Sequence, residues 1–505
     1  MNIPRRKFLK LGTGSLALLA AGCDQLPQEL RGFLLTQANE SGPFLPPCRE
    51  SIDPVVHAIN RITFGQRPGD YARIRKLAGN PEQAAAAYIE QQLHPEKLDD
   101  EEAEYAARRF ETLSLPLGEL FEYQQNLLHH ELMRATLVRA VRSQRQLYEV
   151  MVQFWSDHFN IDPSKGDCKW LKVGDDRDVI RKHALGKFPE MLQASALSPA
   201  MLWYLDGRVN RRQSGADKPN ENYARELLEL HTLGVHGGYT QKDVMDVARC
   251  LTGWTVRSKG ERPFFQIGKV EFNPSQHDFG AKEVLGTRIA AALPGLSREQ
   301  RQRRGRQELE QVIQLAACHP ATARHISTKL CRRFIADEPP IEAVNTVAAA
   351  FSQSSGDIGA TLRALFNTAQ FQQERGNLFK RPFHFVVSAL RATSAQTDGG
   401  MSIIDFLSRM GQAPFSYPTP DGYPQQAAPW MGTLLWRWNF AVALSRNRIQ
   451  GTRIHLDTLR SNAGGDTGLM AHLLGRKATA QEARAYDESG AGLALMLASP
   501  AFQRC

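Results

Sequence analysis

Two helical segments of the sequence carry histidines where they could support metal chemistry. His158 lies within an apolar stripe of segment 145–160, and His231 lies in the middle of the apolar face of segment 220–233. Buried imidazoles from two helices can converge on a transition metal or a haem iron, with neighbours fixing their tautomers. Asp157 points away from the stripe of His158 and can serve only a neighbouring helix. The alternative is that both histidines are hydrogen-bonded core residues.

The segment 220–233 also carries carboxylates on one face. At 100° per residue, Asn222, Glu226 and Glu229 fall within about 60° of each other. Glu226 and His231 are about 140° apart, so one helix cannot chelate an ion with both. The carboxylates either line a cleft as cation ligands or an acid–base pair, or form a solvated face with an Arg225–Glu229 ion pair.

A third group of reactive side chains lies in a loop. His277, Asp278 and Lys282 follow Asn273-Pro274 within six residues, and loops commonly display catalytic groups. They offer a base or metal ligand, an orienting carboxylate and a cation. The alternative is a loop held by its own hydrogen bonds.

Two further segments predict turns and rigid loops. Asp206-Gly207 resembles a helix-end turn, with Gly207 free to take positive φ and Asp206 as a turn former. Residues 410–424 are rich in proline and glycine and predict a rigid loop. The aromatic residues that could line a groove there, or merely cover the core, are Tyr417, Tyr423 and Trp430.

Helices must position all of these groups. From Asp53 onward, apolar residues recur at three-to-four spacing, and proline or glycine punctuates most junctions. We expect an all-α or nearly all-α body, with a small irregular or β excursion near 255–305. The best hairpin candidates are residues 263–273 and 284–289. The predicted organisation is a helical domain over 51–450 and a C-terminal helical extension over 451–505.

The first 22 residues predict an export signal. A weakly apolar run of about eleven residues, too short to span a bilayer, follows a charged start. The residues that resemble the twin-arginine motif are Arg5, Arg6, Phe8, Leu9 and Lys10.

Cys23 closes a lipobox-like Leu-Ala-Ala-Gly-Cys and is the expected lipidation site, with residues 23–50 as a tether. Cleavage without lipidation would instead give a soluble periplasmic protein. Asp24 resembles the signal that keeps lipoproteins on the inner membrane. We therefore expect a periplasmic protein that interacts with the twin-arginine translocase during export and is held at the membrane by its lipid anchor.

The composition narrows the classes of partner that the protein could bind. The formal net charge is +9, but much of the excess lies in the signal and in the run Arg298 to Arg306, which we interpret as a solvated loop. A nucleic-acid-binding protein would be basic over a surface, so no nucleic acid is expected. Six cysteines besides Cys23 permit disulfides in an oxidising compartment, but no C-x-x-C motif is present.

Several polar segments are too distinctive for generic helices. They are N-R-I-T-F-G (60–65), F-W-S-D-H-F-N (154–160), L-D-G-x-x-N (205–210), N-E-N-Y-A-R-E-L-L-E-L-H-T-L-G (220–234), G-Y-T-Q-K-D-V (238–244), L-T-G-W (251–254), H-D-F-G-A-K (277–282) and M-G-Q-A-P-F-S-Y-P-T-P-D-G-Y-P (410–424). In this order they resemble the bacterial family called domain of unknown function 1800, over nearly all of residues 53–450. The resemblance implies an exported protein and brings no reaction or ligand.

Two functions are compatible with these patterns. One is a cofactor- or metal-dependent extracytoplasmic enzyme, with redox chemistry favoured over hydrolysis, because twin-arginine export carries folded proteins that can load a cofactor before export. The other is a non-catalytic envelope scaffold or ligand-binding lipoprotein. No C-x-x-C-H, G-x-S-x-G or H-E-x-x-H motif is present. The candidate metal ligands are His158, His231 and His277, and the candidate acid–base or orienting groups are Glu226, Asp278 and Lys282.

Overall fold

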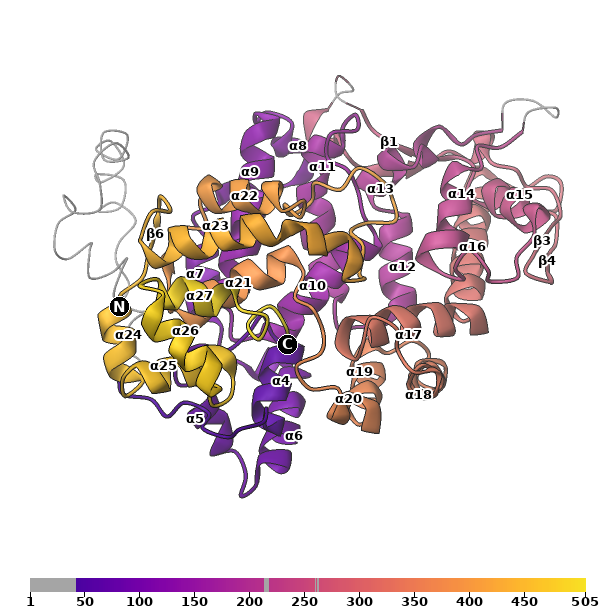
Figure 1. Ribbon diagram of the computed structural model, residues 1–505. Helices are drawn as coiled ribbons and strands as arrows, with labels where there is room; N and C mark the ends of the chain where they lie inside the picture. Colours follow the sequence, from indigo (N-terminus) through magenta and orange to yellow (C-terminus); the bar gives the residue numbers. More distant parts are fainter. Residues whose placement is uncertain (1–41, 213–217, 259, 261–262) are drawn as a thin grey trace.

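A computed structural model describes residues 42–212, 218–258, 260 and 263–505 of the chain (Figure 1). The predicted export and lipidation residues, from Arg5 to Cys23, lie outside these ranges. The described part is mostly helical, and its sheets have two strands each. The predicted fold class is confirmed.

The helices follow one another along the whole described chain. The first are α4 (Pro54–Ile62), α5 (Asp70–Arg75), α6 (Pro81–Gln92), α7 (Glu101–Ala107), α8 (Leu117–Leu120), α9 (Gln125–Arg142), α10 (Gln146–His158) and α11 (Cys168–Asp175). The next are α12 (Phe188–Ala196), α13 (Pro199–Tyr204), α14 (Asn222–Glu226), α15 (Gln241–Cys250), α16 (Arg298–Ala317), α17 (Pro320–Phe334), α18 (Ile341–Gln353), α19 (Ile358–Phe366) and α20 (Ala369–Gln373). The last are α21 (Pro382–Ala392), α22 (Met401–Arg409), α23 (Leu434–Ser445), α24 (Leu456–Asn462), α25 (Asp466–Leu474), α26 (Ala480–Glu488) and α27 (Gly492–Ala498).

Short antiparallel pairs interrupt the helices. The strands are β1 (Trp254–Val256) with β2 (Val270–Phe272), β3 (Lys282–Val284) with β4 (Thr287–Ile289), and β5 (Gln396–Thr397) with β6 (Thr452–Arg453). The hairpin expected at 284–289 is present as β3–β4. Leu285 and Gly286 both have positive φ, as a two-residue hairpin turn requires. The segment 263–273 supplies β2, but its partner β1 lies earlier in the chain.

One contiguous hydrophobic core runs through the described body. Figure 1 shows α10 near the middle, α12 and α14–α16 towards one side, and α24–α27 on the other. Every residue of α21 is buried, which fits a helix that is apolar on all faces. The end of α10, with its Phe154-Trp155 pair, is therefore fixed by packing on several sides.

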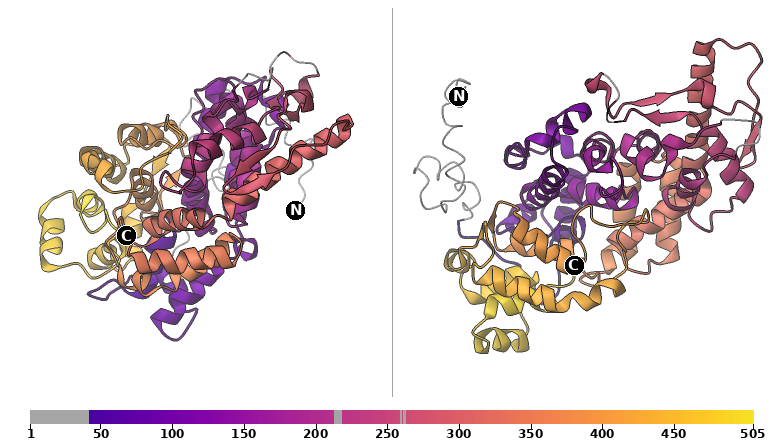
Figure 2. Two further views of the ribbon diagram at one scale, coloured as in Figure 1. Left: turned by 90° about the vertical axis from the view of Figure 1, so that its right-hand side faces the viewer. Right: turned by 90° about the horizontal axis from the view of Figure 1, so that it is seen from above.

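Two local predictions were wrong. The basic run Arg298 to Arg306 is not a loop but the start of α16, which projects from one side of the body (Figure 2). Ser297 and Gln300 form a capping box there, and the arginines occupy helical turns with much solvent exposure. At the 205–210 turn the positive φ falls on Asp206 and not, as had been expected, on Gly207, although a Cβ on Gly207 would press on Leu202 Cδ2 at 2.9 Å.

The C-terminal residues pack into the body. α27 contacts α23, and Cys505 exchanges backbone hydrogen bonds with Leu378. All six cysteines in the described part are free thiols, and Cys48 and Cys318 are the exposed ones among them. No helix in the described ranges is both long and apolar enough to cross a membrane.

Candidate functional site

His158 ends α10 inside a cluster of aromatic rings. The side chain is 1% exposed, and Trp155, Phe159 and Phe188 surround it. Its Nε2 lies 3.1 Å from the backbone carbonyl of His231, which can only accept a hydrogen bond. Nε2 therefore carries the proton and Nδ1 has a free lone pair.

Lys329 uses that lone pair. Its Nζ lies 2.8 Å from Nδ1 of His158, so the lysine donates to the neutral imidazole. Lys329 lies on α17, where His325 is one turn earlier, and the side chain of Lys329 is only half-buried. The Lys329–His158 pair thus joins a deeply buried ring to a side chain that is partly open to solvent.

His231 reaches the same place through an irregular turn. Residues Leu227–His231 form η6, a single π-helical turn that follows α14. π-turns insert an extra residue into a helix and are frequent at functional sites. The rings of His158 and His231 are 6.1 Å apart, and those of His158 and His325 are 6.3 Å apart. Three imidazoles and one amine therefore share a small volume.

The hydrogen bonding of the two other rings differs. His325 Nε2 lies 3.3 Å from the carbonyl of Leu230, and a Cβ on Gly234 would approach His325 Nδ1 to 2.9 Å. His231 is 0% exposed, and neither of its ring nitrogens has a hydrogen-bond partner within the described chain. His231 is thus a buried group with unused donor and acceptor capacity.

Burial sets the protonation of this cluster. Burial, and then the charge of Lys329, lowers the pKa of His231 to about 3 and that of His325 to about 4. The same causes hold the pKa of His158 well below its usual range. Burial lowers the pKa of Lys329 to about 8, although Asp157 counteracts it. The imidazoles are neutral at pH 7, and the lysine titrates near physiological pH.

Asp157 connects this cluster with a cavity. Its Oδ2 lies 3.0 Å from Nη1 of Arg381. Burial raises the pKa of Asp157, and Arg381 and Lys329 act in the opposite direction. The sequence predicted that Asp157 serves a different helix from its own, and the contact with Arg381, just before α21, fits that.

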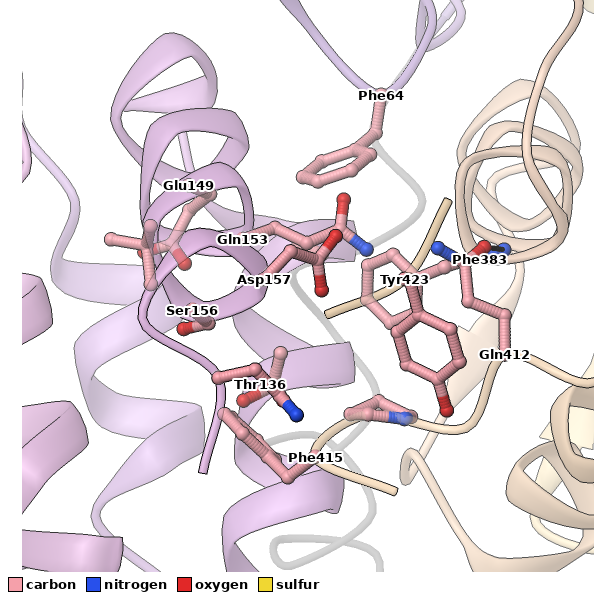
Figure 3. Close-up of a pocket in the computed structure, with 14 residues that line it drawn as sticks. Phe64, Thr136, Glu149, Gln153, Ser156, Asp157, Phe383, Gln412, Phe415 and Tyr423 are labelled. Atoms are coloured by element: carbon pink, nitrogen blue, oxygen red, sulfur yellow. Dashed lines mark hydrogen bonds between the residues drawn. The ribbon is translucent and has the colours of Figure 1, made fainter. Parts of the chain in front are cut away.

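The cavity lies between α10 and the 410–424 loop (Figure 3). Asp157 and Gln153 face Tyr423 and Gln412 across it. Its volume is about 30 Å³, and a single water needs about 10–15 Å³ by this measure. The lining atoms without a protein partner in the described chain are Thr136 Oγ1, Ser156 Oγ and Gln412 Nε2. The cavity therefore suits one or two bound waters rather than a substrate.

The 410–424 loop is fastened over the end of α10. Asn160 Nδ2 donates to the carbonyls of Tyr417 at 2.9 Å and Thr419 at 2.7 Å. Gly422 has φ +71°, and a Cβ there would lie 1.9 Å from the carbonyl oxygen of Asp157. Glycine is required at this position because the backbones touch. Tyr423 packs against Trp430, so both cover the core, and Tyr423 also lines the cavity.

A group of carboxylates lies beside the cluster. Burial raises the pKa of Glu226, with contributions from Glu229 and Asp421. The negative charge of Asp421, in the 410–424 loop, also acts on Lys329. Arg225 pairs with Glu229 at 3.4 Å, as the helical spacing predicted. The charge of Asp421 therefore acts on both Glu226 and Lys329.

His277, Asp278 and Lys282 lie in a separate buried network. His277 Nε2 and Lys282 Nζ lie 3.2 and 2.6 Å from the same oxygen of Glu308, and His277 Nδ1 lies 2.8 Å from the carbonyl of Thr252. Burial opposes ionisation of Asp278, but hydrogen bonds, first from Arg249, lower its pKa to about 2. These contacts fasten the loop to α15 and α16 and match the structural alternative.

The predicted metal ligands are thus only partly together. His158 and His231 adjoin, whereas His277 belongs to the other network with both nitrogens engaged. In the described ranges, no three His, Cys, Asp or Glu side chains are arranged to hold a metal ion. The sequence reasoning missed Lys329 and His325. Their i, i+4 spacing on one helix face was an available signal.

A comparison with family models identifies the chain. The family described as "Protein of unknown function (DUF1800)" matches residues 57–504. The chain belongs to this family. The match includes both buried networks and continues through residues 451–504, beyond the boundary expected near 450. No curated protein and no solved structure matches the chain.

Proposed function

We propose that this DUF1800 protein is an exported, lipid-anchored enzyme in which Lys329 accepts a proton from the substrate and His158 orients the amine of Lys329. The observation that supports it best is the 2.8 Å contact between Lys329 Nζ and His158 Nδ1 at the half-buried edge of a neutral imidazole cluster. A lysine with a lowered pKa is a suitable general base.

The contact with His158 also orients the amine. When Lys329 is neutral, one N–H bond donates to Nδ1 of His158, and the lone pair on Nζ points elsewhere and can accept a proton. The carbonyl of His231 holds the imidazole in the Nε2–H tautomer, so the ring does not compete as a donor to Lys329. Glu226, whose pKa burial raises, is the candidate for the acid.

This proposal differs from the metal- or haem-dependent redox enzyme expected from the sequence. Both ring nitrogens of His158 already have partners, and a metal would have to displace Lys329 to bind Nδ1. His231 alone among the predicted ligands has both ring nitrogens unpartnered in the described chain. Metal analysis of the natively exported protein tests the difference: stoichiometric metal that is lost in His231→Ala would favour the cofactor-dependent enzyme.

Export and anchoring rest on the sequence of the first 23 residues. Arg5-Arg6 with Phe8 and Leu9 supports twin-arginine export, and Cys23 supports lipidation and retention at the periplasmic face of the inner membrane. Arg5→Lys/Arg6→Lys should abolish export. Cys23→Ala should remove an acyl label and release the protein from the membrane fraction, whereas an unchanged distribution would contradict the anchor.

The catalytic proposal can be tested without a known substrate. Competitive acetylation with isotopic acetic anhydride, read by peptide mass spectrometry, reports the pKa of each accessible lysine. We expect the pKa of Lys329 to be about 8. In the double variant His325→Gln/His231→Gln, this pKa should rise only if the substitutions relieve the burial of the amine. Titration at an ordinary lysine pKa would refute the proton-transfer pair.

Activity is then sought in an envelope extract. The purified protein is incubated with the extract, and the small molecules are compared by mass spectrometry between wild type, Lys329→Met and the exposed control Lys97→Met. Products that form with wild type and Lys97→Met but not with Lys329→Met support the enzyme. Identical profiles for all three would favour the non-catalytic scaffold.

A further inference from the structure

An uncovered apolar strip lies at the start of α23 and in η9 (Ala428–Thr433), the 3-10 turn before it. Met431, Leu434, Leu435 and Trp438 are 51%, 50%, 66% and 39% exposed. Their spacing is i, i+3, i+4 and i+7, which places them on one helical face. Figure 1 shows α23 crossing the near face of the molecule. We call these four residues the α23 strip.

The strip is separate from the core. The opposite face of α23 buries Arg437, Phe440 and Leu444 against α21 and α27. Other strongly exposed apolar side chains, such as Phe265 and Leu293, lie in other elements. Four neighbouring apolar side chains on one helix mark an interaction surface, whereas single ones do not.

The chain segment that carries the strip has basic but no acidic side chains, although α22, which packs on α23, contributes an Asp405–Arg409 ion pair. Residues 422–456 contain four arginines and no aspartate or glutamate. Arg446, Arg448 and Arg453 are exposed, and Arg437 is buried. An apolar helix face with a tryptophan and neighbouring arginines has the composition of a helix that lies in the interface of an anionic bilayer.

The predicted anchor can bring this face to a membrane. The first described residues lie against α24, where Phe44 N donates to the carbonyl of Asn462 at 2.9 Å. α24 contacts α25, α25 contacts α27, and α27 contacts α23. The tether from Cys23 to Gly42 spans at most about 65 Å when extended. Its folded end and the α23 strip therefore belong to one group of packed helices.

We propose that the α23 strip docks the body onto the anionic phospholipid surface of the membrane that carries the Cys23 anchor. This inference rests on the proposed anchoring for its location, but not on the proposed enzymatic activity. A lipobox cysteine carries a diacylglycerol, which holds the protein on the membrane but does not orient the body, so a second contact of this kind would fix that orientation.

The test uses the non-acylated chain from residue 24, which retains every described residue. Flotation with phosphatidylglycerol–phosphatidylcholine vesicles is compared with flotation on pure phosphatidylcholine. We expect binding to the anionic vesicles that weakens in high salt, and a loss of about tenfold or more in Leu434→Asp/Leu435→Asp. The matched control is Phe265→Asp/Leu293→Asp, which changes two apolar residues elsewhere that are even more exposed and should bind like wild type.

A second measurement locates the contact. Brominated lipids should quench tryptophan fluorescence in the bound protein, and Trp438→Phe should remove most of that quenching. Absence of vesicle binding by wild type, or equal binding by the Leu434/Leu435 variant, would overturn the inference. Dimers of wild type that dissociate in that variant, with no vesicle binding, would overturn it in favour of a contact between copies. Absence of an acyl label on Cys23 in the natively exported protein would refute the anchor alone, because the chain used in the vesicle assays is not acylated.

Discussion

Replacing Lys329 by methionine should stabilise the protein at neutral pH. The lysine is held in a site that lowers its pKa from 10.5 to about 8, chiefly by burial. A lowered cationic pKa means that the folded state disfavours the charged form. At pH 7 the amine is protonated in both folded and unfolded chains, so folding bears the full cost of burying the charge.

The magnitude follows from the pKa difference. A change in pKa from 10.5 to about 8 corresponds to roughly 3 kcal/mol, because each pKa unit is worth about 1.4 kcal/mol. Methionine removes this cost but leaves Nδ1 of His158 without its donor, which costs about 1 kcal/mol. We expect Lys329→Met to be about 2 kcal/mol more stable than wild type at pH 7.

The difference should reverse as the pH rises. Between pH 8 and pH 10.5 the unfolded chain binds more protons at this position than the folded chain, so wild type gains stability relative to the variant. The neutral amine above this window carries no charge-burial cost and still donates to His158. Near pH 10 the two proteins should be about equally stable, because the unfolded lysine is still largely protonated there, and the variant should become the less stable protein, by about 1 kcal/mol, only above pH 10.5.

Urea unfolding followed by circular dichroism, at several values between pH 6 and pH 10, measures this difference. The contributions of other titrating groups cancel in the difference between wild type and variant, because both proteins contain these groups. Lys97→Met replaces an exposed lysine and should stay within about 0.5 kcal/mol of wild type at every pH. A Lys329→Met variant that is less stable at pH 7, or a difference that does not depend on pH, would refute the protonation argument.

Two other substitutions test the packing of the two networks by the same unfolding assay. Gly422→Ala should lose clearly more stability than Gly238→Ala. Both glycines have positive φ, which costs an alanine about 1–2 kcal/mol. A Cβ at position 422 would also meet the carbonyl of Asp157, whereas a Cβ at position 238 would meet no atom. Equal losses would mean that the 410–424 loop is not seated on α10. Glu308→Gln should cost about 3–5 kcal/mol because Lys282 keeps a buried charge, and adding Lys282→Met should recover part of it. No recovery in the double variant would show that the loss does not come from the unpaired charge.

The sequence was sufficient for the fold class because apolar periodicity is a local property. The buried position of His158 and of His231 followed from the same periodicity, and both are 1% exposed or less. The Arg298 to Arg306 run was assigned wrongly because charge density was taken as a loop signal, although Ser297 and Gln300 have the capping-box spacing. Apolar periodicity did not reveal the start of α16, because the first turns of this helix carry no apolar stripe.

The composition of the site depended on contacts that no local pattern encodes. The angle between Glu226 and His231 assumed regular α-helix geometry, but η6 is a π-turn and its extra residue changes the rotation. Lys329 lies 171 positions after His158, and only the packing of α17 against the end of α10 brings the two together. Long-range pairing of this kind requires the tertiary structure.

The unpartnered ring of His231 is the strongest physical argument that this cluster has a function. A buried polar group without a hydrogen bond costs about 1–3 kcal/mol, and leucine at this position would avoid that cost. The neighbouring network around Glu308 contains no such loss, because both His277 nitrogens and Lys282 have partners there. The buried His277 is thus fully hydrogen-bonded, whereas the buried His231 is not. The open one borders Lys329, and this is where a ligand, a water or a proton would complete the hydrogen bonding.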